Sequence, residues 1–353
     1  MKIAAGIIIA LAIFISGFFI LKGTVFNSVN QSNSSSEADA TASPAPDCAV
    51  TLIDSDAVYN GKTYEKKQGD IYGDLPIPTS DQLINPDSTN PDSKSVFAGW
   101  YNESDKGKRI GVGSDVVCNS SLYGRWTTVA ENKKANVGVP ILMFHYFTKD
   151  ANDPAANADY MLASDFDKEM KYLHDNNFYY PSWKELSAFI DGKLSLPKKS
   201  VMVTDDDNEI SWYNIGVPII NKYKIYSTMF CITGSWWESR EKSPSKYVMQ
   251  RSHTNGMHNP QNGHFIGYMA NLSASQIAKD LEESAKKLKA KEVLAYPSGA
   301  FNPEVEKGVR EAGFEMAVTT DPGVVKIGSN KLELPRVRMS FGQSLESFIA
   351  SVS

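Results

Sequence analysis

The stretch Val201-Met202-Val203-Thr204-Asp205-Asp206-Asp207-Asn208 decides how the rest of the sequence is interpreted. Its apolar beginning is typical of a short buried strand, and three carboxylates in succession end that strand. Carboxylates crowded at the end of a buried strand are costly to fold around unless a cation binds there. In parallel α/β proteins, ligand and catalytic sites collect at the carboxyl ends of the strands. The stretch therefore predicts a cation site at the carboxyl end of a parallel sheet.

A second polar segment, Ser252-His253-Thr254-Asn255-Gly256-Met257-His258, holds two of the five histidines in the chain. Two histidines and one aspartate are a common ligand set for a catalytic divalent metal that keeps open coordination positions. Histidines at this spacing fit one face of a helix poorly, so we expect a loop or a distorted turn to present them.

Composition and the N-terminal residues set the general class of the protein. The 353 residues carry a formal net charge of −5, which gives no basic surface for nucleic acid. Residues 3–21 are uncharged and mostly apolar, long enough to cross a bilayer. We expect residues 1–22 to be an uncleaved transmembrane anchor that leaves the rest of the chain outside the cell membrane, with a cleaved signal peptide as the alternative. Residues 23–47, rich in Ser, Asn and Ala, are expected to form a flexible linker.

Residues 48–129 show short apolar runs broken by turn residues, which predicts a small all-β domain. An exported location permits disulfides, and we expect Cys48 to pair with Cys118. Cys231 lies in an apolar strand pattern and is expected to be an inert thiol in the core.

The strands that close this domain resemble those of the Listeria–Bacteroides repeat module, a β-grasp-like unit of bacterial surface proteins. The resemblance rests on Phe97-Ala98-Gly99-Trp100-Tyr101 and Leu122-Tyr123-Gly124-Arg125-Trp126, in a single copy. The aromatic residues Trp100, Tyr101 and Trp126 then have two interpretations, a surface on which sugars stack or the core of a very small domain.

From about residue 137 to residue 353, predicted strands and helices alternate, as in an α/β fold with a parallel sheet. Helix starts are indicated at Ser164, at Ser182 with Glu185, at Ser273 and at Asn302-Pro303. No glycine-rich phosphate loop follows any predicted strand, so we expect an incomplete (β/α) barrel rather than a doubly wound sheet.

The residues of this large domain resemble the NodB-type polysaccharide deacetylases, carbohydrate esterase family 4. Thr204, Asp206 and Asp207 match the family's Thr-Phe-Asp-Asp-Gly motif, and His253-Thr254 with His258 match its metal motif with one extra residue between the histidines. That spacing resembles the subgroup of poly-N-acetylglucosamine de-N-acetylases. The strand that opens at Val139 and ends at His145, together with two later segments, agrees with this subgroup; the segments are Ala295-Tyr296-Pro297-Ser298-Gly299 and Leu334-Pro335-Arg336.

The resemblance implies a role for each candidate residue. Asp207, His253 and His258 would hold a divalent metal, zinc, cobalt or nickel, which activates water and polarises the carbonyl. Asp206 would be the general base, with a second metal ligand or a strand cap as the alternatives. His145 would be the general acid, or a buried structural histidine. The backbone N–H of Ser298 would stabilise the oxyanion. The expected substrate-binding residues are Arg251, Tyr296, Pro297 and Arg336, although for both arginines two alternatives stand, orienting a carboxylate of the site or forming an exposed ion pair.

The resemblance therefore predicts a membrane-anchored hydrolase that acts on carbon–nitrogen bonds and removes N-acetyl groups from peptidoglycan or poly-N-acetylglucosamine outside the cell. The small domain would provide contact with the cell wall. Asp205 and Asn208 depart from the family motif, which has Phe and Gly at these positions, and this leaves a catalytically degenerate wall-binding protein as one alternative. An O-acetyl esterase of a wall polysaccharide is the other.

Overall fold

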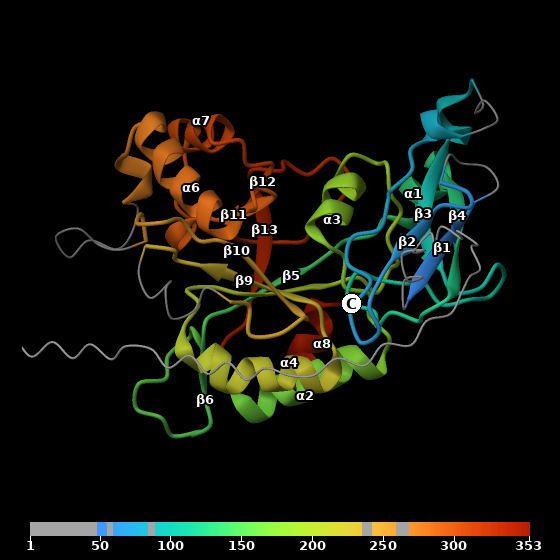
Figure 1. Ribbon diagram of the computed structural model, residues 1–353. Coiled ribbons are helices and arrows are strands. Elements are labelled where there is room, and N and C mark those ends of the chain that lie inside the picture. The colour runs from blue at the N-terminus through green and yellow to red at the C-terminus, as the bar shows by residue number, and fades with distance from the viewer. Residues whose placement is uncertain (1–47, 55–58, 84–88, 235–241, 259–267) are drawn as a thin grey trace, which may run out of the picture. The chain divides into compact units, whose positions relative to one another are not determined.

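The structure is a computed structural model that describes residues 48–54, 59–83, 89–234, 242–258 and 268–353 (Figure 1). Residues 46–353 form one compact unit. The expected anchor at 1–22 and the expected linker at 23–47 lie outside the described residues. Across the described ranges, no helix combines the length and the apolar character needed to cross a membrane.

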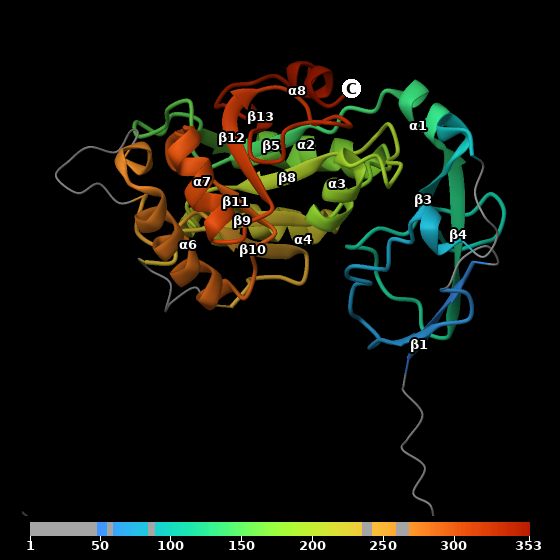
Figure 2. The same cartoon turned by 90° about the horizontal axis from the view of Figure 1, so that it is seen from above.

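The small domain is built on a four-stranded mixed sheet with the order β2-β1-β4-β3 (Figures 1 and 2). Its central strands β1 and β4 are parallel, and the edge strands β2 and β3 pair with them antiparallel. The strands are β1 (Ala49–Ile53), β2 (Thr63–Glu65), β3 (Ser95–Tyr101) and β4 (Ser120–Thr128), with single-turn helices η1 (Ser80–Gln82) and η2 (Pro91–Ser93). Helix α1 (Val129–Ala135) begins where β4 ends, with a capping box between Thr128 and Glu131.

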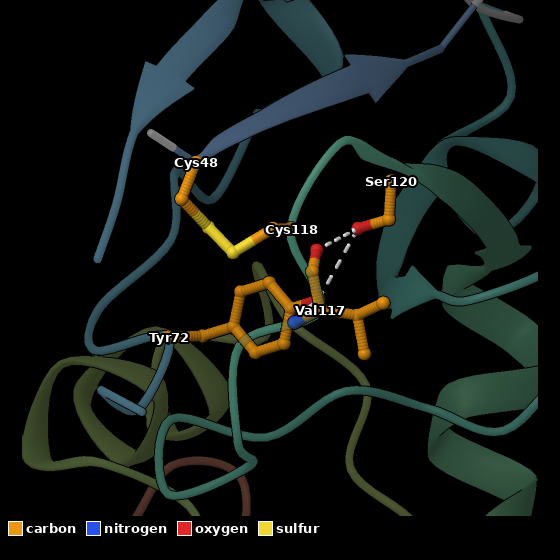
Figure 3. Close-up of a disulfide and its surroundings, with 5 residues drawn as sticks. All are labelled: Cys48, Tyr72, Val117, Cys118 and Ser120. Carbon is orange, nitrogen blue, oxygen red and sulfur yellow. Dashed lines mark hydrogen bonds between the residues drawn. A yellow bond between two sulfur atoms is a disulfide. The ribbon is translucent and has the colours of Figure 1, made fainter. Parts of the chain in front are cut away.

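A disulfide joins Cys48 to Cys118, which confirms that prediction (Figure 3). Each cysteine lies just before one of the two central strands, and their Cα atoms are 4.6 Å apart. The neighbouring Val117 backbone is held on both sides: its N–H donates to the Tyr72 hydroxyl at 3.2 Å, and its carbonyl accepts from the Ser120 hydroxyl at 2.5 Å. Because the bond closes a loop of 70 residues, it restricts the unfolded chain and contributes about 2–4 kcal/mol.

The aromatic residues of the small domain divide between its core and its surface. Trp100 is 3% exposed and donates its indole N–H to the carbonyl of Pro76 at 2.8 Å. Phe97 packs edge-on against both Trp100 and Trp126. Tyr101 is partly exposed and lies under the guanidinium of Arg125. Trp100 is therefore a core residue, so the interpretation as a sugar-stacking surface is wrong for this side chain.

The large domain is a closed barrel of parallel strands with the order β10-β11-β12-β13-β5-β8-β9. The sequence predicts an incomplete barrel, and this one closes with fewer strands than the eight of a full (β/α)₈ barrel. The strands are β5 (Ile141–Phe144), β8 (Met202–Asp205), β9 (Ser227–Cys231), β10 (Val248–Ser252), β11 (Val293–Ala295), β12 (Met316–Pro322) and β13 (Leu334–Arg338). All four residues of β8 are buried, as expected for a parallel strand covered on both faces, and so is Cys231 in β9.

Helices cover the outside of the barrel, α6 and α7 on one part and α2, α4 and α8 on another (Figures 1 and 2). Their bounds are α2 (Ala163–Asp175), α3 (Trp183–Ile190), α4 (Val217–Tyr223), α6 (Ala274–Leu288), α7 (Pro303–Glu311) and α8 (Leu345–Ser351). Ser182 and Ser273 form capping boxes and Asn302 caps α7, as predicted, but α2 begins one residue before Ser164, which does not cap it.

The sheet and the barrel share one hydrophobic core. The cluster that contains Val50 and Phe97 of the sheet continues through Trp183 and Leu194 into the barrel strands. The backbone N–H of Ser195 donates to the carbonyl of Phe97 at 2.8 Å. The small domain is thus packed directly against the barrel.

Candidate active site

The carboxyl ends of the parallel strands bring the predicted polar residues together. His145 follows the last residue of β5, Asp206 and Asp207 follow β8, and His253 follows β10. Because β5 pairs with β8 and β9 pairs with both β8 and β10, these strand ends lie on one rim of the barrel. Arg336 reaches the same rim from β13.

Asp206 is held by a buried two-point ion pair with Arg336. Both guanidinium nitrogens donate to the carboxylate at 2.8 Å, and Arg336 also donates to the carbonyl of Thr319 at 2.7 Å. Asp206 is 2% exposed and Arg336 is 1% exposed. Burial opposes ionisation of Asp206, but the charge and hydrogen bonds of Arg336 outweigh it and hold the pKa of Asp206 well below its usual range. Arg336 thus keeps Asp206 ionised at neutral pH when no substrate is bound.

Asp207, His253 and His258 converge with the geometry of a metal site. Their ligand atoms all lie within 4.8 Å of one another. Nε2 of His253 is 3.3 Å and Nε2 of His258 is 3.2 Å from Oδ1 of Asp207. Within the described residues, that buried oxygen has no hydrogen-bond partner. The three side chains come from a strand end and one loop, as the sequence predicts.

The hydrogen bonds of His253 show that these residues fit a cation. Nδ1 of His253 lies 2.9 Å from the carbonyl oxygen of Ala295, which can only accept, so Nδ1 carries the proton. Burial lowers the pKa of His253, but the hydrogen bond and charge of Asp207 outweigh it and raise that pKa. The contact between Nε2 and Asp207 thus favours a positive charge between them, which a proton or a metal ion supplies. Burial lowers the pKa of His258 to about 4, which keeps that ring in the neutral form that ligates metals.

His145 lies beside the ion pair of Asp206 with Arg336 and is not one of the three residues of the candidate metal site. Its Nε2 is 3.8 Å from Oδ2 of Asp206, and its side chain is 16% exposed. Burial lowers the pKa of His145, and the negative charge of Asp206 partly offsets this effect. A partly exposed imidazole next to the strand ends is accessible to a substrate and is able to exchange a proton with it.

Residues in the left-handed backbone conformation follow the strand ends and set the direction of the site side chains. Strand β8 stops at Asp205, and Asp207 and Asn208 then have φ values of 72° and 46°. This turn explains how adjacent carboxylates, which would alternate in a strand, both serve one site. Thr254, next to His253, has a φ of 68°. Such conformations cost about 1–3 kcal/mol each in residues other than glycine and cluster at functional sites.

Three of the predicted substrate-binding residues are not brought to this cluster. Arg251 forms an ion pair at 2.7 Å with Glu292. Glu292 lies just before the start of β11, at the opposite end of that strand from the site. Tyr296 is fully buried and stacks on Phe301, and Pro297 is also buried. These positions are inaccessible to a substrate, so the prediction of substrate contact is wrong for Tyr296 and Pro297. Arg336 is equally buried and serves Asp206 instead of a sugar.

Ser298 is exposed in the turn η5 (Pro297–Gly299), with a φ of 54°. Throughout the described ranges, no hydrogen bond or ion pair links Ser298 to the site. The proposed use of its backbone N–H remains a prediction.

The structure adds a residue that sequence reasoning missed. Tyr146, which directly follows His145, donates its hydroxyl hydrogen to Oδ2 of Asp207 at 3.3 Å and stacks on Tyr160. Its strand β6 (Tyr146–Thr148) pairs with β7 (Tyr160–Leu162) outside the barrel. The only signal in the sequence is its position next to a candidate catalytic histidine.

Comparisons with known proteins agree with this architecture. A family model described as polysaccharide deacetylase matches residues 193–317. A Bacillus subtilis protein assigned to the polysaccharide deacetylases is 26% identical over 221 residues, which cover 61% of this chain and 76% of that protein. The poly-beta-1,6-N-acetyl-D-glucosamine N-deacetylase of Staphylococcus aureus is 29% identical over 195 residues, 50% of this chain and 67% of the enzyme.

Among solved structures, the deacetylase PplD of Streptococcus pyogenes, in complex with acetate, superposes with a TM-score of 0.53 at 24% identity. The match covers 62% of this chain and 99% of that one. It supports the barrel-like fold. The match to the polysaccharide deacetylase family model thus covers residues 193–317 of this chain, and the similar curated proteins agree with the prediction of a hydrolase that acts on carbon–nitrogen bonds.

Proposed function

We propose that this chain is a metal-dependent deacetylase that removes N-acetyl groups from a polymer of N-acetylglucosamine, such as peptidoglycan or poly-N-acetylglucosamine. One observation carries the proposal: the ligand atoms of Asp207, His253 and His258 lie together beside the ion pair of Asp206 with Arg336, and within the described part of the chain the buried Oδ1 of Asp207 has no hydrogen-bond partner. The name of the staphylococcal relative, a poly-N-acetylglucosamine N-deacetylase, supports an amino-sugar polymer as the substrate.

Each residue has a chemical role in this proposal. Asp207, His253 and His258 would hold a divalent metal, preferably zinc and otherwise cobalt or nickel, which would make water nucleophilic and polarise the acetyl carbonyl. Asp206 accepts the proton from the attacking water, and Arg336 keeps its carboxylate ionised and oriented. His145 donates a proton to the amine nitrogen as the carbon–nitrogen bond breaks. Acetate and a free amine are the products.

The two departures from the family motif are accommodated by the structure. Asp205 is fully buried, and within the described residues its carboxylate oxygens have no hydrogen-bond partner. Burial and the adjacent Asp206 raise the pKa of Asp205 well above its usual range, which favours its neutral form. Asn208 takes the left-handed backbone that the family's glycine provides and accepts a hydrogen bond from the N–H of Ile232 at 3.0 Å. These observations favour an active site over a degenerate one.

We also infer an extracytoplasmic, membrane-anchored protein whose small domain contacts the cell wall. The disulfide between Cys48 and Cys118 supports an oxidising location. The antiparallel pairing of Phe97 with Trp126 and of Tyr101 with Tyr123 supports the resemblance to the Listeria–Bacteroides repeat module. The anchor itself is proposed for residues 1–22.

The proposal is tested by measuring acetate and free amine released by the purified full chain. The panel is poly-N-acetylglucosamine, peptidoglycan and O-acetylated xylan. We expect equal amounts of acetate and amine from one of the first two polymers. Removing metal with a chelator should abolish release, and adding Zn²⁺, Co²⁺ or Ni²⁺ should restore it.

Three results would point elsewhere. Full activity of a verified metal-free protein would contradict the proposed metal dependence. Acetate without amine would make the protein an O-acetyl esterase. Tight polymer binding without any acetate release would leave a wall-binding protein.

A further inference from the structure

The loop that carries the two histidines is tied to helix α6 by a polar stripe. Asp280, Ser284 and Lys287 follow one another at spacings of four and three along α6, which places them on one face of the helix. The hydroxyl of Ser284 lies 2.8 Å from that of Ser252, which in turn accepts from the backbone N–H of Thr254 at 3.1 Å. The whole stripe therefore faces the loop.

Asp280 makes the most direct contacts with this loop. Its two carboxylate oxygens accept hydrogen bonds from the backbone N–H groups of Asn255 at 2.7 Å and Gly256 at 2.8 Å. These are consecutive residues midway between His253 and His258. A carboxylate that receives two backbone N–H groups fixes both the position and the direction of the peptide units.

Three further hydrogen bonds hold Asn255. Its carbonyl accepts from the backbone N–H of Gly234 at 2.6 Å, and its side-chain oxygen accepts from Lys287 at 2.9 Å and from Thr233 at 3.1 Å. A Cβ atom at Gly234 would lie 2.1 Å from the Asn255 carbonyl oxygen, so only glycine permits this approach.

The loop needs such support because its two histidines are five residues apart. Residues five apart on a helix point about 140° away from each other, so helical hydrogen bonds alone do not aim both rings at one point. The loop instead includes Thr254 in a left-handed conformation, which persists only where the surrounding structure imposes it. External hydrogen bonds take the place of the helical ones.

We propose that Asp280 is the positioning residue of the metal centre: it holds the His253–His258 loop in the conformation that ligates, without touching the metal or the substrate. The inference rests on the metal centre of the proposed function. Loss of a partner of this kind typically weakens metal binding or activity by about 10–100-fold.

The test uses the full chain and Zn²⁺. Zinc affinity is measured by competition with a chromophoric chelator for the unmutated protein, Asp280→Asn, Asp280→Ala and Glu283→Gln. Glu283 lies on the same helix, is exposed and pairs with Lys286, so its variant controls for charge on α6. We expect about 10–100-fold weaker zinc binding in Asp280→Ala, a smaller loss in Asp280→Asn, and none in Glu283→Gln.

A second measurement separates positioning from general stability. In the metal-free protein, hydrogen exchange at the amides of Asn255 and Gly256 should accelerate in Asp280→Ala, while exchange in β8 and β9 stays unchanged. Unchanged zinc affinity in Asp280→Ala, or acceleration throughout the barrel, would overturn the proposal.

The same data distinguish this proposal from the proposed function. Tight zinc binding by the unmutated protein without acetate release would refute the deacetylase and leave the role of Asp280 standing. Absence of zinc binding by the unmutated protein would overturn the metal centre and the role of Asp280 together.

Discussion

Asp205, Asp206 and Asp207 are consecutive residues, but each carboxyl group has a different environment. Asp205 is fully buried and raised in pKa, Asp206 is paired with Arg336, and Asp207 faces two histidines. The sequence predicts that the negative charge of Asp205 raises the pKa of Asp206 unless a cation such as Arg251 or Arg336 compensates. Burial raises the pKa of Asp205 well above its usual range, and Arg336 provides the compensating cation for Asp206, so we expect little effect of Asp205 on Asp206.

Replacing these aspartates one at a time should therefore give three distinct results. Asp207→Asn should lose the metal, measured by elemental analysis of the purified protein. Asp206→Asn should keep the metal and lose about 10²–10⁴ in rate. Asp205→Asn should retain most activity with an unshifted acidic limb in its pH profile. An inactive Asp205→Asn together with a metal-free Asp206→Asn would mean that the roles are shifted by one residue.

His145 is predicted to matter through its proton. His145→Ala should lower the rate on N-acetyl substrates by about 10²–10⁴, because an amine leaves poorly without protonation. Activated acetate esters, whose leaving groups need no proton, should lose much less. Since the acid must be protonated to act, the rate on amides should fall as pH rises through the lowered pKa of His145, and this limb should be missing in the variant. Equal losses on amides and esters, with a lower melting temperature, would indicate a structural histidine.

Glu169 in α2 provides a pH test that is independent of catalysis. The residue is 1% exposed, its carboxylate oxygens have no partner within the described residues, and burial raises its pKa from 4.5 to about 9. The unfolded chain loses the proton near pH 4.5 and the folded chain keeps it, so Glu169 lowers the free energy of unfolding as pH rises between these values, by at most about 1.4 kcal/mol for each pH unit.

Glu169→Gln should accordingly raise the melting temperature at pH 8 and leave it nearly unchanged at pH 4. Glu311→Gln on α7 is a matched control, since that side chain is exposed. A stabilisation that is the same at both pH values would show that Glu169 is ionised in the folded protein.

At the scale of helices and strands, local signals in the sequence predict most of the architecture. Ser182 with Glu185 marks the start of α3, and Asn302 that of α7, because capping depends only on neighbouring residues. The helical segment that continues into α4 begins instead with a π-helical turn, Trp212–Gly216. Pro218 lacks an N–H for the regular ladder, and a Cβ at Gly216 would meet the Trp212 ring at 2.2 Å. This distortion depends on packing that periodicity does not report.

Sequence analysis predicts those residues of the site that belong to short motifs. Asp206, Asp207 and His253 stand next to strand ends, where chemistry in parallel sheets collects, and His258 follows in the same short motif as His253. The sequence offers both Arg251 and Arg336 as cations for Asp206 but does not choose between them, because Arg336 is 130 residues away and its pairing depends on barrel closure. Asp280 was missed for the same reason: it contacts the histidine loop from another helix. Tyr296 illustrates the opposite error, a residue close to the motif in sequence but directed into the core.

At the scale of the molecule, the shared core predicts that the barrel does not fold well alone. Tyr179, Leu194 and Tyr226 are 8%, 1% and 6% exposed. Gly111 and Gly113 of the small domain pack against Tyr179 and Tyr226, and the strand β3 covers Leu194. A fragment of residues 137–353 would present these side chains to water and should aggregate or bind a hydrophobic dye, whereas residues 48–353 should remain monomeric and dye-free in size-exclusion chromatography. A monomeric, dye-free 137–353 fragment would contradict this.

The shared core also has a consequence for how such a gene is able to change. Where two domains have separate cores, recombination is free to exchange one and keep the other. Here an exchange at residue 137 would break the packing of Phe97 on Leu194 and leave both products with an uncovered apolar face. The segment that encodes the sheet and the segment that encodes the barrel are therefore expected to be inherited together.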